Sequence, residues 1–360
     1  MKKLLAVILS IVCLVAFAGC SGNSGTSSAL TENESNSVSS EAPKFAKDPL
    51  TGEYTLEFSA ENKRPVAIMI NNIKISLPQR GISEASIIYE ALAEGGITRL
   101  MAVFPDVNKI PDVGSVRSAR HYYLSLANGH NAVFVHFGGS KYALDYIKEN
   151  GIKTINFLNT QGSYRDPNRV GKIPYEHTAF TSGDRLVKAI ASKKINTDAT
   201  IKDAYKFGDN SSTLKLGNGA YTMTVPFSSS TKATFTYNEA TGKYEKGQFG
   251  KEHIDGATGK ALEFTNVFVL QTAISLMNAN SKANYIDVKL TSGSGYYACG
   301  GKIVPISWTK SGFDGEIKYY TTDGKELTVK EGKSYVGIIS ENREVTYEGK
   351  PVPTQTTSSK

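Results

Sequence analysis

The sequence predicts a protein of the α+β or α/β class, in which an N-terminal mixed α/β sandwich domain precedes a smaller β-rich domain. Two observations favour this fold class. In the first half, apolar runs of strand length alternate with helical segments, which is typical of an α/β layer with partly parallel strands. In the second half, short strand-like runs are separated by turn-forming residues. We place the two domains at residues 56–203 and 204–345.

The first half changes element type repeatedly from its beginning. Residues 65–72 and 97–106 are apolar strand-like runs, and residues 81–94 begin as a helical turn and continue as a strand. Ser118 is expected to cap a helix that Gly129 closes. The elements expected after this helix are a strand at 132–137, a helix at 141–151, a strand at 152–157 and a helix at 185–193.

The second half contains the run of strands that defines the β-rich domain. Hairpin turns are expected at 238–242 and at Asp323-Gly324, because Asn, Asp and Gly tolerate the backbone angles that tight turns require. The strands are expected at 222–227, 233–246, 266–274, 284–291, 301–310 and 316–329.

The first twenty residues, MKKLLAVILSIVCLVAFAGC, are typical of a secretory signal that ends in a lipobox. Two lysines precede an apolar stretch that is short for a membrane span, and Phe17 to Cys20 resemble a lipoprotein cleavage site. We therefore predict a signal peptide at 1–19 and a diacylglyceryl group on Cys20. This lipid would anchor the protein to the outer face of the cytoplasmic membrane. An ordinary signal peptide cleaved near Ala18 is the alternative interpretation.

Both ends of the mature chain are expected to be disordered. Residues 21–43 are rich in Ser, Gly, Asn and Glu, so they bury too little apolar surface to offset their chain entropy. We predict a flexible tether at 20–55 and a disordered tail at 346–360. Of the three cysteines only Cys299 lies in the folded body, so no disulfide is expected within the chain.

The composition limits the partners that the sequence predicts. The formal net charge of +7 falls to +5 when Lys2 and Lys3 leave with the signal peptide. This mild basicity suits a solvated surface, and it also suits contact with an anionic wall polymer, peptidoglycan or a lipid surface. Nucleic acid is not expected outside the membrane. No metal or other cofactor is expected, because the chain has neither an H-E-x-x-H motif nor a cysteine pair. The sequence does not predict an oligomeric state.

The stretch GSVRSARHYY, residues 114–123, gathers the strongest candidates for a binding site. Arg117 and Arg120 are three residues apart at the start of the expected helix, with His121 beside them and Arg99 on the preceding strand. Guanidinium groups suit phosphate or carboxylate, and helix N-termini favour anions. The alternative is an internal salt-bridge network.

That alternative network would pair the arginines with Glu90 and Glu94. These glutamates are four residues apart, so we expect them to share one face of their element. Both interpretations stay open, because a paired carboxylate can also orient an arginine toward a ligand.

Weaker candidates lie elsewhere in the chain. His136 and Ser140 flank a glycine turn that leads into a helix, His177 lies in a charged loop, and His253 and Asp255 lie close together in GKEHIDGATGK. A glycine turn can cradle an anion, and loops often carry binding residues. A structural histidine, a surface loop and a turn pair are the more ordinary interpretations. No catalytic residue is assigned.

Several motifs resemble a known family. INNIKISLPQRGISEASIIYEALAEGGITRLMAVF, VGSVRSARHYYLSLA and VFVHFGGSKYAL resemble the N-terminal domain of YerB-type bacterial lipoproteins, a domain of unknown function (DUF3048). GKEHIDGATGKALEFTNVFV and SGSGYYACGGKIVPISWTK resemble its C-terminal companion. The resemblance covers residues 64–339 and implies a two-domain envelope lipoprotein, with no established reaction. A looser resemblance is to LytR-CpsA-Psr phosphotransferases, but residues 118–120 lack their paired Asp.

The sequence therefore favours a non-catalytic binding protein. It would hold an anionic envelope ligand, such as a wall glycan or a phosphate-bearing polymer, beside Arg117 and Arg120. One alternative is an envelope phosphotransferase or glycan-acting enzyme, for which Glu90 and Glu94 would supply two carboxylates. Another alternative is a scaffold that regulates a cell-wall enzyme through the β-rich domain.

Overall fold

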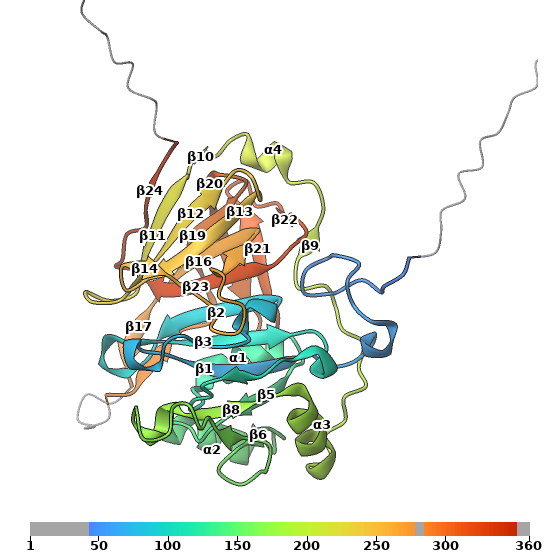
Figure 1. The fold of residues 1–360 in the computed structure, drawn as a ribbon. Helices are drawn as coiled ribbons and strands as arrows, with labels where there is room; N and C mark the ends of the chain where they lie inside the picture. Colours follow the sequence, from blue (N-terminus) through green and yellow to red (C-terminus); the bar gives the residue numbers. More distant parts are fainter. Residues whose placement is uncertain (1–42, 278–283, 351–360) are drawn as a thin grey trace, which may run out of the picture. The chain divides into compact units, whose positions relative to one another are not determined.

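A mixed sheet contains strands from both halves of the sequence (Figure 1). The computed structural model describes residues 43–277 and 284–350. Within this part of the chain the sheet has eleven strands, in the order β10-β20-β19-β16-β23-β2-β3-β1-β5-β6, with β21 paired to β20. Their bounds are β1 Val66–Asn72, β2 Ile87–Leu92, β3 Thr98–Phe104, β5 Val133–His136, β6 Ile155–Asn156, β10 Asn218–Gly219, β16 Asn266–Thr272, β19 Ser292–Cys299, β20 Lys302–Lys310, β21 Ile317–Thr321 and β23 Ser334–Ser340.

The two halves of this sheet meet at β23. This strand comes from the C-terminal half, and it runs parallel to both β16 and β2. Its first six residues are buried, as expected of a strand that is covered on both faces. The domain boundary predicted between residues 203 and 204 stays a prediction. In the structure, the pairing of β23 with β2 joins the segments on the two sides of this boundary in one sheet.

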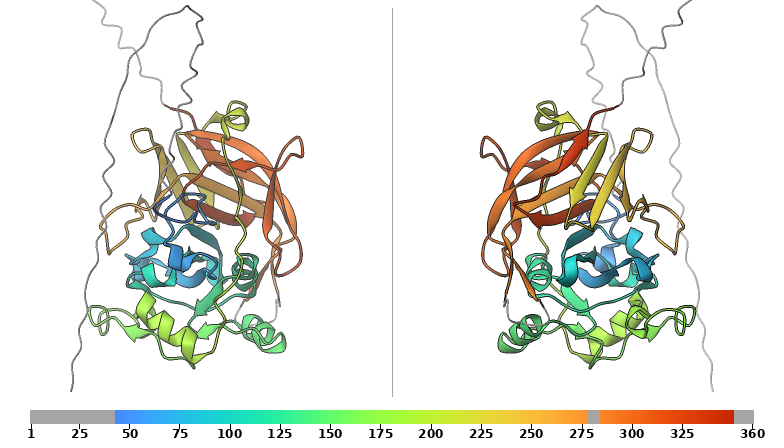
Figure 2. Two further views of the ribbon diagram at one scale, coloured as in Figure 1. Left: turned by 90° about the vertical axis from the view of Figure 1, so that its right-hand side faces the viewer. Right: turned by 90° about the vertical axis from the view of Figure 1, so that its left-hand side faces the viewer.

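A second sheet lies in the C-terminal half. Its order is β14-β13-β12-β11-β24, with β15 paired to β13. Both views in Figure 2 show the strands of the C-terminal half at one end of the body and the helices α2 and α3 at the other. The bounds are β11 Thr222–Pro226, β12 Lys232–Asn238, β13 Lys243–Gln248, β14 Lys251–Glu252, β15 Glu263–Phe264 and β24 Thr346–Glu348.

Helices and short elements complete the fold. The α-helices are α1 His121–Gly129, α2 Lys141–Glu149, α3 Gly183–Ser192 and α4 Ser211–Leu214. The shorter strands are β4 Val113–Gly114, β7 Tyr164–Arg165, β8 Ala179–Thr181, β9 Lys206–Phe207, β17 Ile274–Leu276, β18 Ile286–Val288 and β22 Thr328–Val329. The 3-10 helices are η1 Phe58–Ala60, η2 Lys74–Ser76, η3 Ile82–Glu84, η4 Glu94–Gly96, η5 Val107–Lys109 and η6 Tyr175–His177. No helix in the described ranges is long and apolar enough to span a membrane.

Two apolar cores cover the two faces of the main sheet. Alternate side chains of β1 divide between them: Ile68 and Ile70 belong to one core, and Ala67 and Met69 belong to the other. The first core includes side chains of the second sheet and of α3. The second core includes most of the buried face of α1 and the β19–β20 hairpin. We call these the second-sheet face and the α1 face.

The fold class is the one that the sequence predicts, and most strands of the N-terminal half lie where they are expected. Three local expectations are corrected. The first helix begins at His121. The residue at its N-cap position is Arg120, whose side chain forms no capping hydrogen bond, so Ser118 does not cap the helix. The strands β19 and β23 are additional to those expected. The segment Thr346–Glu348 of the expected tail pairs with β11.

The expected tether is also too long. Its described part, residues 43–55, contributes the buried side chains of Ala46 and Leu50, and the backbone of Ala46 pairs with Leu56. Buried Asp48 accepts hydrogen bonds from the Leu50 amide at 2.8 Å and from the Ser86 hydroxyl at 2.8 Å. The signal peptide, Cys20 and residues 21–42 of the tether lie outside the described residues.

We predict that Leu50→Ala lowers the free energy of unfolding by about 2–5 kcal/mol, because the side chain is fully buried in the core on the α1 face. Chemical denaturation of the body measures this change. Leu216→Ala is the matched control, since that leucine is 88% exposed. Equal effects of the two substitutions would show that residues 43–55 do not pack against the body.

Candidate functional site

The candidate site lies where three parallel strands end. The strands β1, β5 and β6 run parallel, and polar residues stand at or near their carboxyl ends: Asn71, His136 and Asn156. In sheets of this kind, ligands bind in the crevice outside the carboxyl ends of the strands. The residues just before α1 and α2 also pair there, with the Ser140 amide donating to the Ala119 carbonyl at 3.1 Å. The two helix N-termini therefore begin side by side.

Arg99 is the most unusual residue of this region. Its side chain is only 5% exposed, and it forms no hydrogen bond or ion pair with any side chain or backbone group of the described residues. Burial, together with the nearby charges of Arg120 and Arg117, lowers the pKa of Arg99 to about 9. The guanidinium therefore remains charged at neutral pH. A buried charge without a counterion is costly, so its presence is a typical sign of a binding site.

Arg117 and His177 lie beside Arg99. Asn71 on β1 is the cross-strand neighbour of Arg99, and its side-chain amide donates to Nδ1 of His177 at 2.8 Å. This contact assigns the proton of neutral His177 to Nε2. Burial, followed by the charge of Arg117, lowers the pKa of His177. Arg117 donates from Nη1 to the Glu176 carbonyl at 3.1 Å, and its buried Nε has no partner within the described ranges.

Arg120 has a different environment. Its Nε donates to Oε1 of Glu94 at 2.7 Å, and its Nη2 is ion-paired to the other carboxylate oxygen. The two side chains are 8% and 18% exposed. One part of the expected internal network is therefore present. The arginine cluster divides into one paired member, Arg120, and two members without a carboxylate partner in the described chain, Arg99 and Arg117.

The expectation that Glu90 pairs with these arginines is wrong. Glu90 follows the alternation of β2 and lies on the second-sheet face with Ile88, whereas Arg99 lies on the α1 face. Glu90 instead forms an ion pair with Lys246 at 3.2 Å, and the two side chains are 2% and 0% exposed. The remaining lone pairs of Glu90 accept hydrogen bonds from Asn72 at 2.9 Å, Thr98 at 2.7 Å and Tyr335 at 2.8 Å.

His253 and Asp255 belong to this buried network and not to the arginine site. The Lys246 ammonium donates to Nδ1 of His253 at 3.1 Å, so Nε2 carries the proton and donates to Oε1 of Gln79 at 2.8 Å. Burial holds the pKa of His253 well below its usual value. Asp255 accepts from the amides of Gly81 and Ser83 at 2.9 and 2.8 Å. Both residues therefore fasten the C-terminal half to the loop after β1.

The three remaining candidates have contacts that serve the fold. His136 lies between the Gly138 carbonyl at 2.7 Å and the Thr154 hydroxyl at 2.9 Å. Ser140 caps α2 by accepting from the Ala143 amide at 3.3 Å. His121 contacts Asp287 at 2.8 Å. In the described ranges, no group of three or more His, Cys, Asp or Glu residues is arranged to hold a metal ion.

Sequence reasoning missed the polar residues that support the site. The signal was present at the end of β1, where two asparagines follow the apolar run PVAIMI. Adjacent residues of a strand point to opposite faces. Asn71 therefore supports His177 on the α1 face, while Asn72 contacts Glu90 on the second-sheet face. No comparable signal marks Lys246. The residues around it do not distinguish this buried lysine from the exposed lysines nearby in the sequence.

We predict that breaking the buried pair from one side costs far more than replacing both partners. Lys246→Met alone should destabilise the fold by about 3–5 kcal/mol, because it leaves the Glu90 carboxylate buried without a cation. The double variant Glu90→Gln, Lys246→Met should recover a large part of that loss. Denaturant titrations of the four members of this cycle measure the coupling. A double variant as unstable as the sum of the single variants would exclude the ion pair.

Comparison with known proteins gives consistent matches. The family model described as "Protein of unknown function (DUF3048) N-terminal domain" matches residues 50–196, and that of the DUF3048 C-terminal domain matches residues 223–336. YerB of Bacillus subtilis (strain 168), a protein named as a lipoprotein, is 30% identical over 300 residues, which cover 82% of this chain and 87% of YerB. The crystal structure of YerB from Bacillus subtilis matches with a TM-score of 0.73 and 28% identity, over 84% of this chain and 99% of that chain. These matches confirm the resemblance seen in the motifs: the chain belongs to the DUF3048 family and contains both its N-terminal and its C-terminal domain.

Proposed function

We propose that the protein is a membrane-anchored extracytoplasmic lipoprotein that binds an anionic ligand of the cell envelope through Arg99, Arg117 and His177. The observation that carries the proposal is the buried guanidinium of Arg99, which has no counterion among the described residues. A phosphate or carboxylate group of a ligand would supply that counterion. Guanidinium groups bind such groups with two parallel hydrogen bonds.

The neighbouring groups strengthen the positive character of the site. The Nε2–H of His177 is a further donor, and it lies 3.8 Å from the exposed Glu176 carboxylate. The uncapped N-terminus of α1 adds unpaired backbone amides and a partial positive charge. Glu94 favours the charged form of Arg99 from a distance, but its ion pair is with Arg120, which contacts both of its oxygens.

The structure gives no support to glycosyl chemistry between Glu90 and Glu94. Two catalytic carboxylates must flank one bond. Glu90 is bound to Lys246 on the second-sheet face, whereas Glu94 is bound to Arg120 near α1. A binding role is therefore the function that the geometry supports best.

The membrane anchor belongs to the same proposal. The relative YerB is named as a lipoprotein, and the present chain carries the lipobox residues Phe17 to Cys20. A diacylglyceryl group on Cys20 would hold the body at the membrane through the residues that precede Pro43. The anionic ligand would then be a wall glycan or a phosphate-bearing polymer close to that surface.

We predict that Cys20→Ala moves the protein from the membrane fraction to the medium or leaves its signal peptide uncleaved. The lipid has no other attachment point in this mechanism. Cell fractionation and the mass of the mature protein measure both outcomes. Cys299→Ala is the matched control and should leave the protein in the membrane fraction. A Cys20→Ala protein that is processed normally and stays membrane-bound would exclude lipid anchoring.

We predict that Arg99→Gln and Arg117→Gln each weaken the binding of inorganic phosphate and of phosphorylated wall fragments at least tenfold. Each substitution removes a charge-assisted contact of about 1.5–3 kcal/mol. Calorimetric titration of the purified body measures the affinity. Arg185→Gln is the matched control, because it removes the same charge from an exposed position on α3.

Stability measurements on the same variants separate a binding site from a structural cluster. Arg99→Gln removes an uncompensated buried charge and should leave the melting temperature unchanged or raised. Arg120→Gln should lower it, because it leaves Glu94 without its partner. A strongly destabilised Arg99→Gln variant would assign Arg99 to the fold. Unchanged phosphate binding in a stable variant would place the ligand elsewhere.

A further inference from the structure

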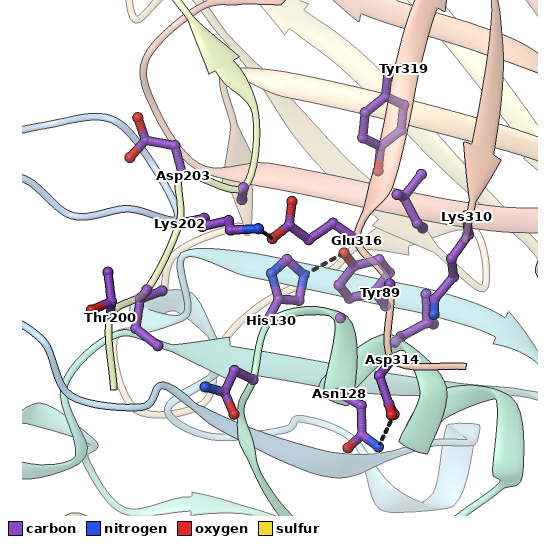
Figure 3. A pocket seen from close by; sticks show the side chains of 17 residues that line it. Tyr89, Asn128, His130, Thr200, Lys202, Asp203, Lys310, Asp314, Glu316 and Tyr319 are labelled. Carbon is purple, nitrogen blue, oxygen red and sulfur yellow. Dashed lines mark hydrogen bonds and ion pairs between the residues drawn. The ribbon is translucent and has the colours of Figure 1, made fainter. Parts of the chain in front are cut away.

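A cavity of about 200 Å³ lies at the opposite end of α1 from the arginines. Its walls come from segments that are distant in the sequence: the end of α1 with His130, the connecting segment Thr200–Ala204, and the residues around β21. Figure 3 shows the side chains of Tyr89, His130 and Glu316 close together in this cavity, with Lys310 and Asp314 beside them. The volume is below the ~300–1,000 Å³ of sites for drug-sized ligands, so the cavity suits a small molecule.

One part of the cavity favours a positively charged group. The carboxylate of Glu316 lies there, whereas Asp203 is ion-paired to Lys47 and Asp314 accepts from the Asn128 amide at 2.8 Å. Glu316 is only loosely paired, with its carboxylate 3.7 Å from the Lys202 ammonium, and that lysine side chain is 78% exposed. The C-terminal end of α1 contributes a partial negative charge. The ring of Tyr319 adds an aromatic surface of the kind that attracts ammonium groups.

A second part of the cavity, beside Lys310, favours a negatively charged group. Lys310 is only 4% exposed, and its ammonium donates to the carbonyls of Gly312 at 3.0 Å and Phe313 at 2.5 Å. These two contacts leave one N–H of the ammonium without a partner in the described chain, and the side chain lines the cavity. Burial lowers the pKa of Lys310 to about 8, so most of the ammonium is charged at neutral pH.

His130 and Tyr89 form an uncharged wall between these parts. The Tyr89 hydroxyl and Nε2 of His130 are 2.7 Å apart. Burial and then the charge of Lys310 lower the pKa of His130 to about 4, so the imidazole is neutral at pH 7. It can therefore hydrogen-bond to a ligand without repelling an ammonium group.

We propose that this cavity binds a small zwitterion of the amino-acid type. The ammonium group of the ligand lies toward Glu316, and its carboxylate accepts the remaining N–H of Lys310. This site is separate from the arginine site, and its ligand carries both charges on one small molecule.

Alanine, in both enantiomers, is the probe for this proposal, with ethylamine and propionate as its two halves. Calorimetry on the wild-type body should show saturable alanine binding at millimolar concentrations or below and much weaker binding of either half. Glu316→Gln and Lys310→Met should each reduce the alanine affinity about tenfold, as expected for one charge-assisted contact. Glu326→Gln, an exposed residue outside the cavity, is the matched control.

Each outcome decides the proposal. Absence of saturable alanine binding by the wild-type protein overturns it. Ethylamine binding as tight as alanine binding, unaffected by Lys310→Met, also overturns it, because the cavity would then recognise only a cation. Lys310 also donates to two loop carbonyls, so the alanine affinity of Lys310→Met tests the proposal only if this variant keeps the wild-type melting temperature. If it does not, the alanine affinity of Glu316→Gln is the test. Retained alanine binding in Arg99→Gln together with lost phosphate binding would separate this site from the arginine site.

Discussion

The buried ion pair between Glu90 and Lys246 is the interaction on which the arrangement of the two sheets depends. Two charges removed from water are tolerated only when hydrogen bonds satisfy their remaining donors and acceptors. Here the carboxylate has three further donors, and the ammonium also contacts Gln248 and His253. Because these contacts are directional, they restrict how the second sheet can sit on the main sheet, which apolar packing alone does not do.

The same network reaches the backbone of the candidate anion site. Gln79 accepts from His253, and its amide donates to the Asn71 carbonyl and to the Asn72 side chain, at 2.9 Å in each case. Asn71 in turn orients His177. Hydrogen bonds through Gln79 and Asn71 thus connect His177 in the N-terminal half to His253 in the C-terminal half. This connection gives a physical reason for both halves to occur in one chain.

The sequence predicted the elements whose signals are local. The apolar run at 65–72 and the helix at 141–151 are found as β1 and α2, because their periodicity is set by nearby residues. The insertion of β23 between β16 and β2 was not predictable in this way, since it is a pairing between distant segments. The candidate site divides along the same line. The arginines were found from their spacing. The predicted pairing of Glu90 with the arginines was wrong, because strand alternation places Glu90 and Arg99 on opposite faces of the sheet.

The helix α1 gives the two candidate sites a common mechanical element. It has nine residues, so its axis spans roughly 13 Å, and six of these residues are buried in the core. A short, well-packed helix moves as a unit, so an axial displacement that opens one end must also change the geometry at the other. Two ligands that favour different axial positions of α1 would then compete through the fold without touching each other. By thermodynamic linkage, the factor by which the first changes the affinity of the second must equal the factor in the reverse direction.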